Sequence, residues 1–421
     1  MRKKSLLLLA LAVFLCPPLL AQAQTEQSDE PVLPAGDGQA TVQTACSRCH
    51  ELARVTNSGY NRAGWQQVVD MMISSGALVK KDQEPVVVDY LTKNFPEKPL
   101  PPAVVIPGSV NVSIKEWKVP TPGSRPHDPL YAPDGSVWYT GNMANLLGRF
   151  DPRTQQFKEY HLKFPHSGPH GLVADKSGNI WFTANQAAYV GKLDPKTGNV
   201  TEYDMPDPNA TDPHTPIFDH GILFFSLQSS DMIGRLDPAT GKIKLVTVPT
   251  QRALPYGMVV SSNGTIFFDE FGAPKIGSMD PETMEIREYP LPNPKARPRR
   301  IAITPDDIIW YSDYARGYLG RLDPKTGKVT EWLSPGGPKS KPYGITAVND
   351  ILWYSESGTK PNTVVRFDPQ TEKFQTWIIP SGGGVVRNMV HTPDGSALWL
   401  ACSGVNGIAE VKIESEKSAG L

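Results

Sequence analysis

A repeat of about 43 residues runs through most of this chain and constrains its fold more than any other feature. Six copies close on an Asp-Pro pair, and these pairs begin at Asp151, Asp194, Asp237, Asp280, Asp323 and Asp368. An aromatic pair lies upstream of each, beginning at Trp138, Trp181, Phe224, Phe267, Trp310 and Trp353, and Trp399 marks a seventh copy. Seven repeats of this length are typical of an all-β seven-bladed propeller with four strands per blade.

One copy divides into four strands separated by turn residues. We expect an inner strand at 171–175, a second at 180–183, a third at 189–194 and an outer strand at 199–203. The aromatic residues of the second strands are expected to pack between neighbouring blades. The last copy ends near Ile413 after three strands, whereas Ile114–Trp117 matches an outer strand, so we expect that early strand to complete the last blade.

Composition agrees with many short strands and excludes several classes of protein. The chain has 421 residues with 41 Pro and 36 Gly, too many for an all-helical protein. Its 42 Lys and Arg balance 43 Asp and Glu, which argues against nucleic-acid binding. Four Cys are too few for a disulfide scaffold.

The first residues have the pattern of a secretory signal peptide. Basic residues precede an apolar run from Leu6 to Leu15, and small residues lead to a predicted cleavage after Ala23. The run is too short to span a bilayer, and no later segment is long and apolar enough to do so. We therefore expect an exported protein, periplasmic in a Gram-negative source, with no integral membrane segment in the mature chain.

A C-x-x-C-H motif lies near the expected mature N-terminus. Cys46 and Cys49 have the spacing of thiols that attach haem c covalently, and His50 is the expected axial ligand of the haem iron. A disulfide or a thioredoxin-like pair would use the same two cysteines, but neither needs His50. The motif predicts a haem c.

Two amphipathic helices are expected after this motif. Trp65, Val68, Val69 and Met72 recur at helical spacing, and a second helix opens at Asp82 with Val86, Val87, Tyr90 and Leu91 on its apolar face. The stretch from Ala45 to Phe95 resembles small bacterial cytochromes c in its C-x-x-C-H, Gly-Trp, Val-x-x-Met and Tyr-Leu motifs. That resemblance implies Met72 as the sixth iron ligand, with Met71 as its rival. From the residues alone, either methionine could instead fill a core.

These patterns divide the chain into five parts. They are a signal peptide at 1–23, a cytochrome c-like haem segment at 24–96, a proline-rich linker at 97–109, the propeller at 110–414 and a tail at 415–421.

The residues just before the inner strands should converge at one mouth of the propeller channel. They are His127, His170, His214, Tyr256, Arg299, Tyr343 and Arg387. Such a ring could bind an anionic substrate, hold a divalent metal on three imidazoles, or form a polar rim around water. A second set, Glu270, Asp313 and Glu356, follows the second strands of three neighbouring blades. These carboxylates could be solvated loop ends or part of a metal-binding wall.

The repeat, with its Trp-Phe-Thr and Gly-Arg-Leu-Asp-Pro phrases, resembles the virginiamycin B lyase family from roughly Val110 to Ile413. That resemblance implies Mg-assisted elimination that opens cyclic streptogramin antibiotics. Family enzymes carry a Glu after Trp-Phe-Thr and a general-base His two residues later. Glu270 and Glu356 occupy the Glu position, and Asp313 is a variant of it. None of the positions two residues later holds His; they are Met143, Gln186, Ser229, Gly272, Ala315, Gly358 and Gly404.

The sequence therefore favours an exported c-type haem protein that carries electrons, with a lyase-like propeller that binds a small-molecule substrate or a redox partner protein. A streptogramin-type lyase with an accessory haem is the first alternative. A non-catalytic haem-bearing sensor or binding module is the second. The sequence leaves open whether the chain is an enzyme and, if so, whether it is an oxidoreductase component or a lyase, because fold likeness does not fix a reaction.

Overall fold

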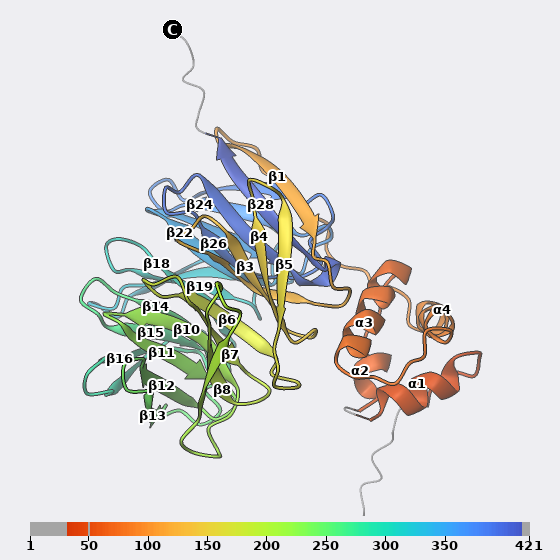
Figure 1. Ribbon diagram of the computed structural model, residues 1–421. Helices are drawn as coiled ribbons and strands as arrows, with labels where there is room; N and C mark the ends of the chain where they lie inside the picture. Colours follow the sequence, from red (N-terminus) through yellow and green to blue (C-terminus); the bar gives the residue numbers. More distant parts are fainter. Residues whose placement is uncertain (1–31, 49–50, 415–421) are drawn as a thin grey trace, which may run out of the picture.

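The structure, a computed structural model, describes residues 32–48 and 51–414 and consists of a helical unit beside a β-propeller (Figure 1). The expected signal peptide, Cys49, His50 and the C-terminal tail lie outside the described residues. Within the described part of the chain, no helix is long and apolar enough to cross a membrane.

Seven sheets of four strands each make up the propeller. The first four blades are β2 (Pro126–Tyr131), β3 (Val137–Gly141), β4 (Leu146–Asp151) and β5 (Gln156–His161); β6 (Pro169–Ala174), β7 (Ile180–Ala184), β8 (Tyr189–Leu193) and β9 (Val200–Asp204); β10 (Pro213–Asp219), β11 (Ile222–Leu227), β12 (Met232–Asp237) and β13 (Lys242–Thr247); and β14 (Pro255–Val260), β15 (Ile266–Glu270), β16 (Lys275–Met279) and β17 (Ile286–Pro290). The strands of the second blade agree with the predicted ones to within two residues.

The ring closes between the two ends of the repeat region. The last three blades are β18 (Pro298–Ile303), β19 (Ile309–Asp313), β20 (Tyr318–Leu322) and β21 (Val329–Leu333); β22 (Pro342–Val348), β23 (Ile351–Glu356), β24 (Thr363–Asp368) and β25 (Lys373–Ile378); and β26 (Val386–His391), β27 (Ala397–Cys402), β28 (Gly407–Glu414) and β1 (Asn111–Lys118). The short 3-10 helix η1 (Ser403–Val405) joins β27 to β28. Strand β1 pairs antiparallel with β28, as the strand count predicted, and so covers an edge that would otherwise be open.

A recurring glycine and a recurring aromatic ring explain the repeated phrase. A Cβ at Gly191 on β8 would overlap the ring of Phe182 on β7, so only glycine lets that ring lie across the third strand. The same pairing joins Gly148 to Tyr139, Gly234 to Phe225, Gly277 to Phe268 and Gly320 to Tyr311. These rings are fully buried, which confirms that the second-strand aromatic residues form the core between blades.

The helical unit contains α1 (Gln39–Cys46), α2 (Ala53–Thr56), α3 (Arg62–Ser74) and α4 (Glu84–Asn94). Its apolar core includes Val42, Leu52, Trp65 and Tyr90. The two predicted amphipathic helices correspond to α3 and α4. On α4 the expected apolar face was wrong at one position: Val86 is 42% exposed, and Val88 lies buried in its place.

The proline-rich linker is fixed along the propeller rather than spanning free space. Ile106 N donates to Thr376 Oγ1 at 2.7 Å, and Lys360 N donates to Pro101 O at 2.9 Å. These bonds tie the linker to the sixth blade and limit where the helical unit can sit.

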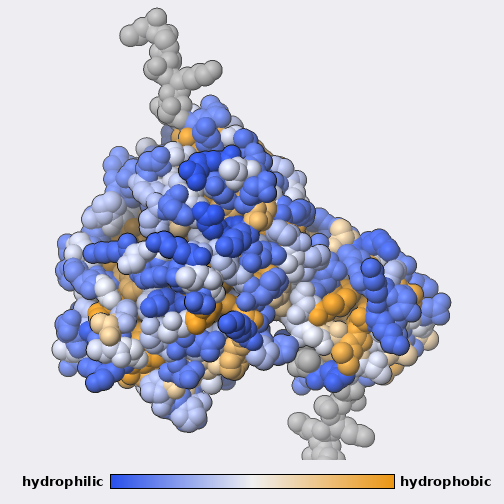
Figure 2. Space-filling view, in the orientation of Figure 1, coloured by the Kyte–Doolittle hydropathy of each residue, from blue (hydrophilic) through white to orange (hydrophobic). Residues whose placement is uncertain are grey.

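Helix α3 contacts the propeller at one end of its channel (Figure 1). Ser74 Oγ donates to Pro122 O at 3.1 Å, and a Cβ at Gly123 would overlap the backbone of α3 at Asp70. In the space-filling view, hydrophobic atoms gather on the side of the helical unit that faces the viewer (Figure 2). Among the described residues of the helical unit, the side chains of Leu78 and Tyr60 are 65% and 41% exposed.

Candidate functional site

Each innermost strand places its second residue at the channel. In all seven blades the register of the first two strands shifts at this point, for example between Pro126 and Pro129 on β2. A β-bulge of this kind re-aims side chains. The predicted ring residues all occupy this position: His127, His170, His214, Tyr256, Arg299, Tyr343 and Arg387.

Hydroxyl groups of the second strands hold the bulges in place. Thr140 Oγ1 accepts from Asp128 N at 3.1 Å and donates to His170 O of the next blade at 2.8 Å. Thr183 repeats the arrangement with Gly171 and His214. The Thr of the Trp-Phe-Thr phrase therefore links the channel position of one blade to that of its neighbour.

Four of the ring residues form a continuous stack of side chains. The ring centroids of His127 and His170 lie 3.7 Å apart, those of His170 and His214 3.6 Å, and those of His214 and Tyr256 3.8 Å. The stack continues through a hydrogen bond of 2.6 Å between the hydroxyl groups of Tyr256 and Tyr343. Arg299 lies 4.1 Å from the ring centroid of Tyr343, so the structure brings together six of the seven residues that the sequence placed at the rim.

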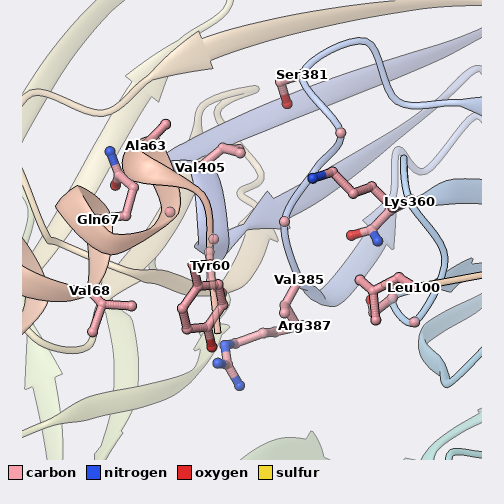
Figure 3. Close-up of a pocket in the computed structure, with 18 of the residues that line it drawn as sticks. Tyr60, Ala63, Gln67, Val68, Leu100, Lys360, Ser381, Val385, Arg387 and Val405 are labelled. Atoms are coloured by element: carbon pink, nitrogen blue, oxygen red, sulfur yellow. The ribbon is translucent and has the colours of Figure 1, made fainter. Parts of the chain in front are cut away.

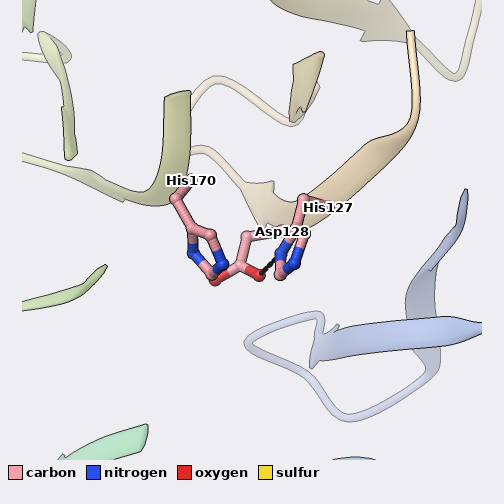
Figure 4. A group of neighbouring side chains, drawn as sticks. All are labelled: His127, Asp128 and His170. Carbon is pink, nitrogen blue, oxygen red and sulfur yellow. Dashed lines mark hydrogen bonds and ion pairs between the residues drawn. The ribbon is translucent and has the colours of Figure 1, made fainter. Parts of the chain in front are cut away.

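A buried ion pair crosses the channel beside this stack. Arg300 Nη2 on β18 donates to Asp128 Oδ1 on β2 at 2.6 Å, and both side chains are 4% exposed. Arg300 Nη1 also reaches Thr215 Oγ1 on β10 at 3.4 Å. Asp128 accepts a further contact from His127 Nδ1 at 2.9 Å, visible in Figure 4. Three blades are therefore tied together across the axis.

The three histidines are neutral in this setting. Burial, followed by His170 and several arginines, lowers the pKa of His127 well below its ordinary value. Burial and His214 do the same for His170, and burial and Arg300 for His214. Neutral imidazoles can accept a proton, and among the three only His170 has a buried Nδ1 with no partner among the described residues.

Three arginines near the stack have no carboxylate partner among the described residues; they are Arg125, Arg299 and Arg387. Arg299 lies over aromatic rings instead, 4.1 Å from the centroid of Tyr343 and 4.3 Å from that of Tyr314. Arg125 donates to Asn142 Oδ1 at 3.3 Å. Burial, together with repulsion from Arg387 and Arg299, lowers the pKa of Arg125 to about 9. The mouth thus has a concentration of positive charge.

A cavity of about 560 Å³ lies between this mouth and the helical unit. Tyr60, Gln67, Val68 and Met71 line it from the helical side, and Arg125, Lys341 and Arg387 line it from the propeller. Figure 3 shows Tyr60 and Arg387 on facing walls. Its size is that of a pocket for a drug-sized molecule.

The carboxylates predicted to follow the second strands do not line this cavity. All three are fully buried, so the expectation of solvated loop ends was wrong. Glu356 accepts from Ser334 Oγ, Gly336 N and Thr363 Oγ1 at 2.6–2.7 Å, and Asp313 accepts from Arg316 Nε at 2.6 Å. Asp313 and Glu356 therefore hold neighbouring loops and strands in place.

Glu270 differs from the other two carboxylates because both of its oxygens are buried without a partner. Burial, and then repulsion from Glu288, raise the pKa of Glu270 to about 8. A carboxyl group in this state is largely protonated at neutral pH and is a poor cation ligand.

These residues do not fit the magnesium site that the resemblance implied. Magnesium prefers several oxygen ligands, whereas Asp313 and Glu356 are engaged and Glu270 favours its neutral form. Within the described residues, the group with metal-compatible spacing is His127, Asp128 and His170. Its one carboxylate already pairs with Arg300, and the surrounding arginines repel a cation.

Both methionines considered as iron ligands lie half-buried on α3. Met71 lines the cavity that faces the propeller and Met72 does not, and the choice of iron ligand between them stays a prediction. Cys46 lies at the end of α1, packed against the apolar core, and burial raises the pKa of its thiol. Such an apolar surrounding suits a porphyrin face.

Sequence reasoning missed Arg125, Asp128, Arg300 and Lys341. Arg125 and Asp128 flank the Pro126-His127 pair, and Arg300 follows Arg299 directly, so an aligned repeat could have indicated a second layer of channel residues. Nothing in the sequence indicated that helices would cover them.

The sequence profile of the virginiamycin B lyase family matches residues 107–333, more than half of the chain. This chain belongs to that family. A solved streptogramin B lyase shares 26% sequence identity and superposes with a TM-score of 0.66, covering 72% of this chain and 98% of its own. The virginiamycin B lyase of Staphylococcus aureus shares 24% identity, with a TM-score of 0.66 and coverage of 72% and 99%.

A catalytically inactive histidine-to-alanine variant of the Staphylococcus aureus enzyme, solved with quinupristin, matches with 24% identity and a TM-score of 0.65, covering 72% of this chain and 99% of its own. No curated protein matches this member of the lyase family.

Proposed function

We propose that this protein is an elimination enzyme of the virginiamycin B lyase family whose reaction takes place at the channel mouth beneath the helical unit. The observation that carries the proposal is the row of stacked, buried histidines beside arginines that have no carboxylate partner among the described residues. Elimination next to a carbonyl group needs a base that is unprotonated before reaction, and it is favoured by a positive group where negative charge develops.

In this reaction His170 accepts the proton from the carbon next to the substrate carbonyl. The electron pair left on that carbon forms a double bond as the carbon–oxygen bond at the next carbon breaks. The departing oxygen leaves with the bonding pair, and Arg125 and Arg387 stabilise the negative charge that develops on the carbonyl oxygen next to the deprotonated carbon. The proposed route assigns no role to magnesium, because the carboxylates do not offer a fitting site.

The mass of the product tests this proposal against its competitors. Elimination within a cyclic ester yields an opened isomer of unchanged mass, hydrolysis adds one water, and oxidation removes two hydrogens. We would incubate the full chain with quinupristin and with a set of β-acyloxy carboxylic acids and analyse the products by mass spectrometry. Turnover that gives only hydrolysed or oxidised product would contradict the proposal.

Two variants link the activity to the stack. His170→Gln should abolish elimination, because the amide cannot accept the proton. His391→Gln is the matched control, since His391 lies at the far end of β26 and contacts Thr392 O. Equal loss of turnover in both variants would show that His170 is not the base.

We propose haem binding as a second function, favoured by the C-x-x-C-H motif at the end of α1. Cys46 and Cys49 would hold the haem, with His50 and Met72 as axial ligands, and the group would supply one-electron transfer when bound. The apolar surroundings of Cys46 support this proposal. Export to an oxidising compartment, where haem c is attached, is part of the same proposal.

Chain produced in a host that matures c-type cytochromes should be red and should give a haem spectrum under denaturing conditions. A matched Cys46→Ser and Cys49→Ser variant should be colourless. Colourless wild-type protein with both thiols free to alkylate would contradict the haem proposal and leave the lyase proposal standing.

A further inference from the structure

The cavity beneath α3 contains more positive charge than its neighbours neutralise. Its described lining includes five cationic residues and one acidic residue; the cationic ones are Lys118, Arg125, Lys341, Lys360 and Arg387, and the acidic one is Glu97. Glu97 pairs with Lys360, and Lys118 bonds to a backbone carbonyl. Arg125, Lys341 and Arg387 therefore have no carboxylate partner among the described residues.

Partly buried, unpaired guanidinium groups are costly unless something compensates their charge. Arg387 Nε is buried without a hydrogen-bond partner among the described residues. Arg299 lies close behind, stacked on Tyr314, which also lines the cavity. The aromatic rings screen these cations but provide no anion. The arrangement is therefore complete only when an anion enters the cavity.

Apolar side chains lie among polar ones on the rest of the cavity wall. Val68 and Met71 of α3 face Val385 and Val405 of the last blade across the space. Arg125 and Arg387 supply guanidinium groups from the propeller, and Val68 and Met71 supply apolar side chains from α3. A free inorganic ion would leave those apolar side chains uncovered.

We propose that this cavity binds an organic acid of drug-like size, with its carboxylate on Arg125 and Arg387 and its apolar body beneath α3. The inference rests on the proposed function in that Arg125 and Arg387, which line this cavity, are the arginines assigned to the reaction; His170 is buried in the channel, outside the cavity lining. Guanidinium groups bind carboxylates in a planar, two-point geometry, which also fixes orientation. The proposed ligand class is not limited to streptogramins.

Binding can be tested without turnover, using the fluorescent probe 8-anilinonaphthalene-1-sulfonate, which joins an anionic head to an aromatic body. N-phenyl-1-naphthylamine has nearly the same aromatic body and no charge, and serves as the matched ligand. We expect each chain to bind one molecule of the anionic probe, with an affinity at least tenfold higher than for the neutral probe. Phenylsuccinate should displace the anionic probe, and added NaCl should weaken binding of the anionic probe but not of the neutral one.

Arg387→Gln and Arg125→Gln should each weaken binding of the anionic probe by about 10- to 100-fold, the range expected for a charge-assisted hydrogen bond. Arg153→Gln is the matched control, because the Arg153 side chain is 78% exposed on a turn far from the cavity lining. Equal binding of the two probes, or no effect of salt on the wild-type protein, would overturn the proposal even if a variant failed to fold.

The two proposals can fail separately. Elimination without binding of the anionic probe would overturn the organic-acid assignment and leave the lyase function intact. Tight, salt-sensitive probe binding with no elimination of any β-acyloxy acid would support the site and contradict the lyase function.

Discussion

The ion pair between Asp128 and Arg300 allows a sharp test of how the propeller is held together. It joins the first blade to the fifth across the channel at 2.6 Å, with both side chains 4% exposed. Asp128→Asn keeps the shape of the side chain but removes its charge. Arg300 would then be a buried cation facing Thr215 and the neutral His127. Removing one partner of such a pair typically costs about 3–5 kcal/mol.

The comparison is an exposed pair of the same chemistry. Asp134 and Arg149 are 3.0 Å apart, with side chains 57% and 28% exposed, and breaking an exposed pair costs about 0–1 kcal/mol. Urea unfolding of each variant, followed by tryptophan fluorescence, measures both losses. Because the chain has two units, the propeller transition is the one to compare.

A third variant separates the cost of an orphaned charge from the value of the pair. Replacing both partners, Asp128→Leu with Arg300→Met, should recover most of the lost stability, because no buried charge remains. The reasoning would be refuted if Asp128→Asn were no more destabilising than Asp134→Asn. It would also be refuted if the double replacement were as unstable as Asp128→Asn.

Four further outcomes are expected. Met72→Ala should remove the low-spin reduced-minus-oxidised spectrum of the haem-loaded chain, and an unchanged spectrum would exclude Met72 as a ligand. The pKa of Glu270 is raised to about 8, so the folded state keeps this proton while the unfolded state loses it near pH 4.5. The free energy of unfolding should therefore fall from pH 5 to pH 8. The midpoint of urea unfolding, measured across this pH range, should fall less in Glu270→Gln than in the wild-type protein. Glu356→Gln should instead cost about 1–3 kcal/mol at pH 7, because three donors contact that carboxylate. Gly191→Ala should cost about 1–3 kcal/mol by overlapping Phe182, and Phe182→Leu should relieve part of that cost in thermal unfolding of the pair.

Much of the propeller could be derived from the sequence because its interactions are local and repeated. The turn at Asp194, the strands around it and the buried ring of Phe182 all depend on neighbours within one or two blades. The same periodicity placed His127, His170 and His214 on successive inner strands. Ring closure followed from counting strands, since β1 is the single strand left to pair with β28.

The site depended on contacts that no local pattern encodes. The three carboxylates looked equivalent in the repeat, but only tertiary contacts set Glu270 apart from Glu356 as a carboxyl without donors. Asp128 and Arg300 are 172 residues apart and meet only because the ring is closed.

The sequence by itself determined the number of blades, the order of the strands and which residues face the axis, because these follow from period and strand pairing. Only the tertiary structure decided that α3 covers the mouth of the channel and that Arg125 and Arg387 line a cavity beneath it. The physical reason is that charge compensation and cavity shape depend on distances across the ring, which a linear repeat does not contain.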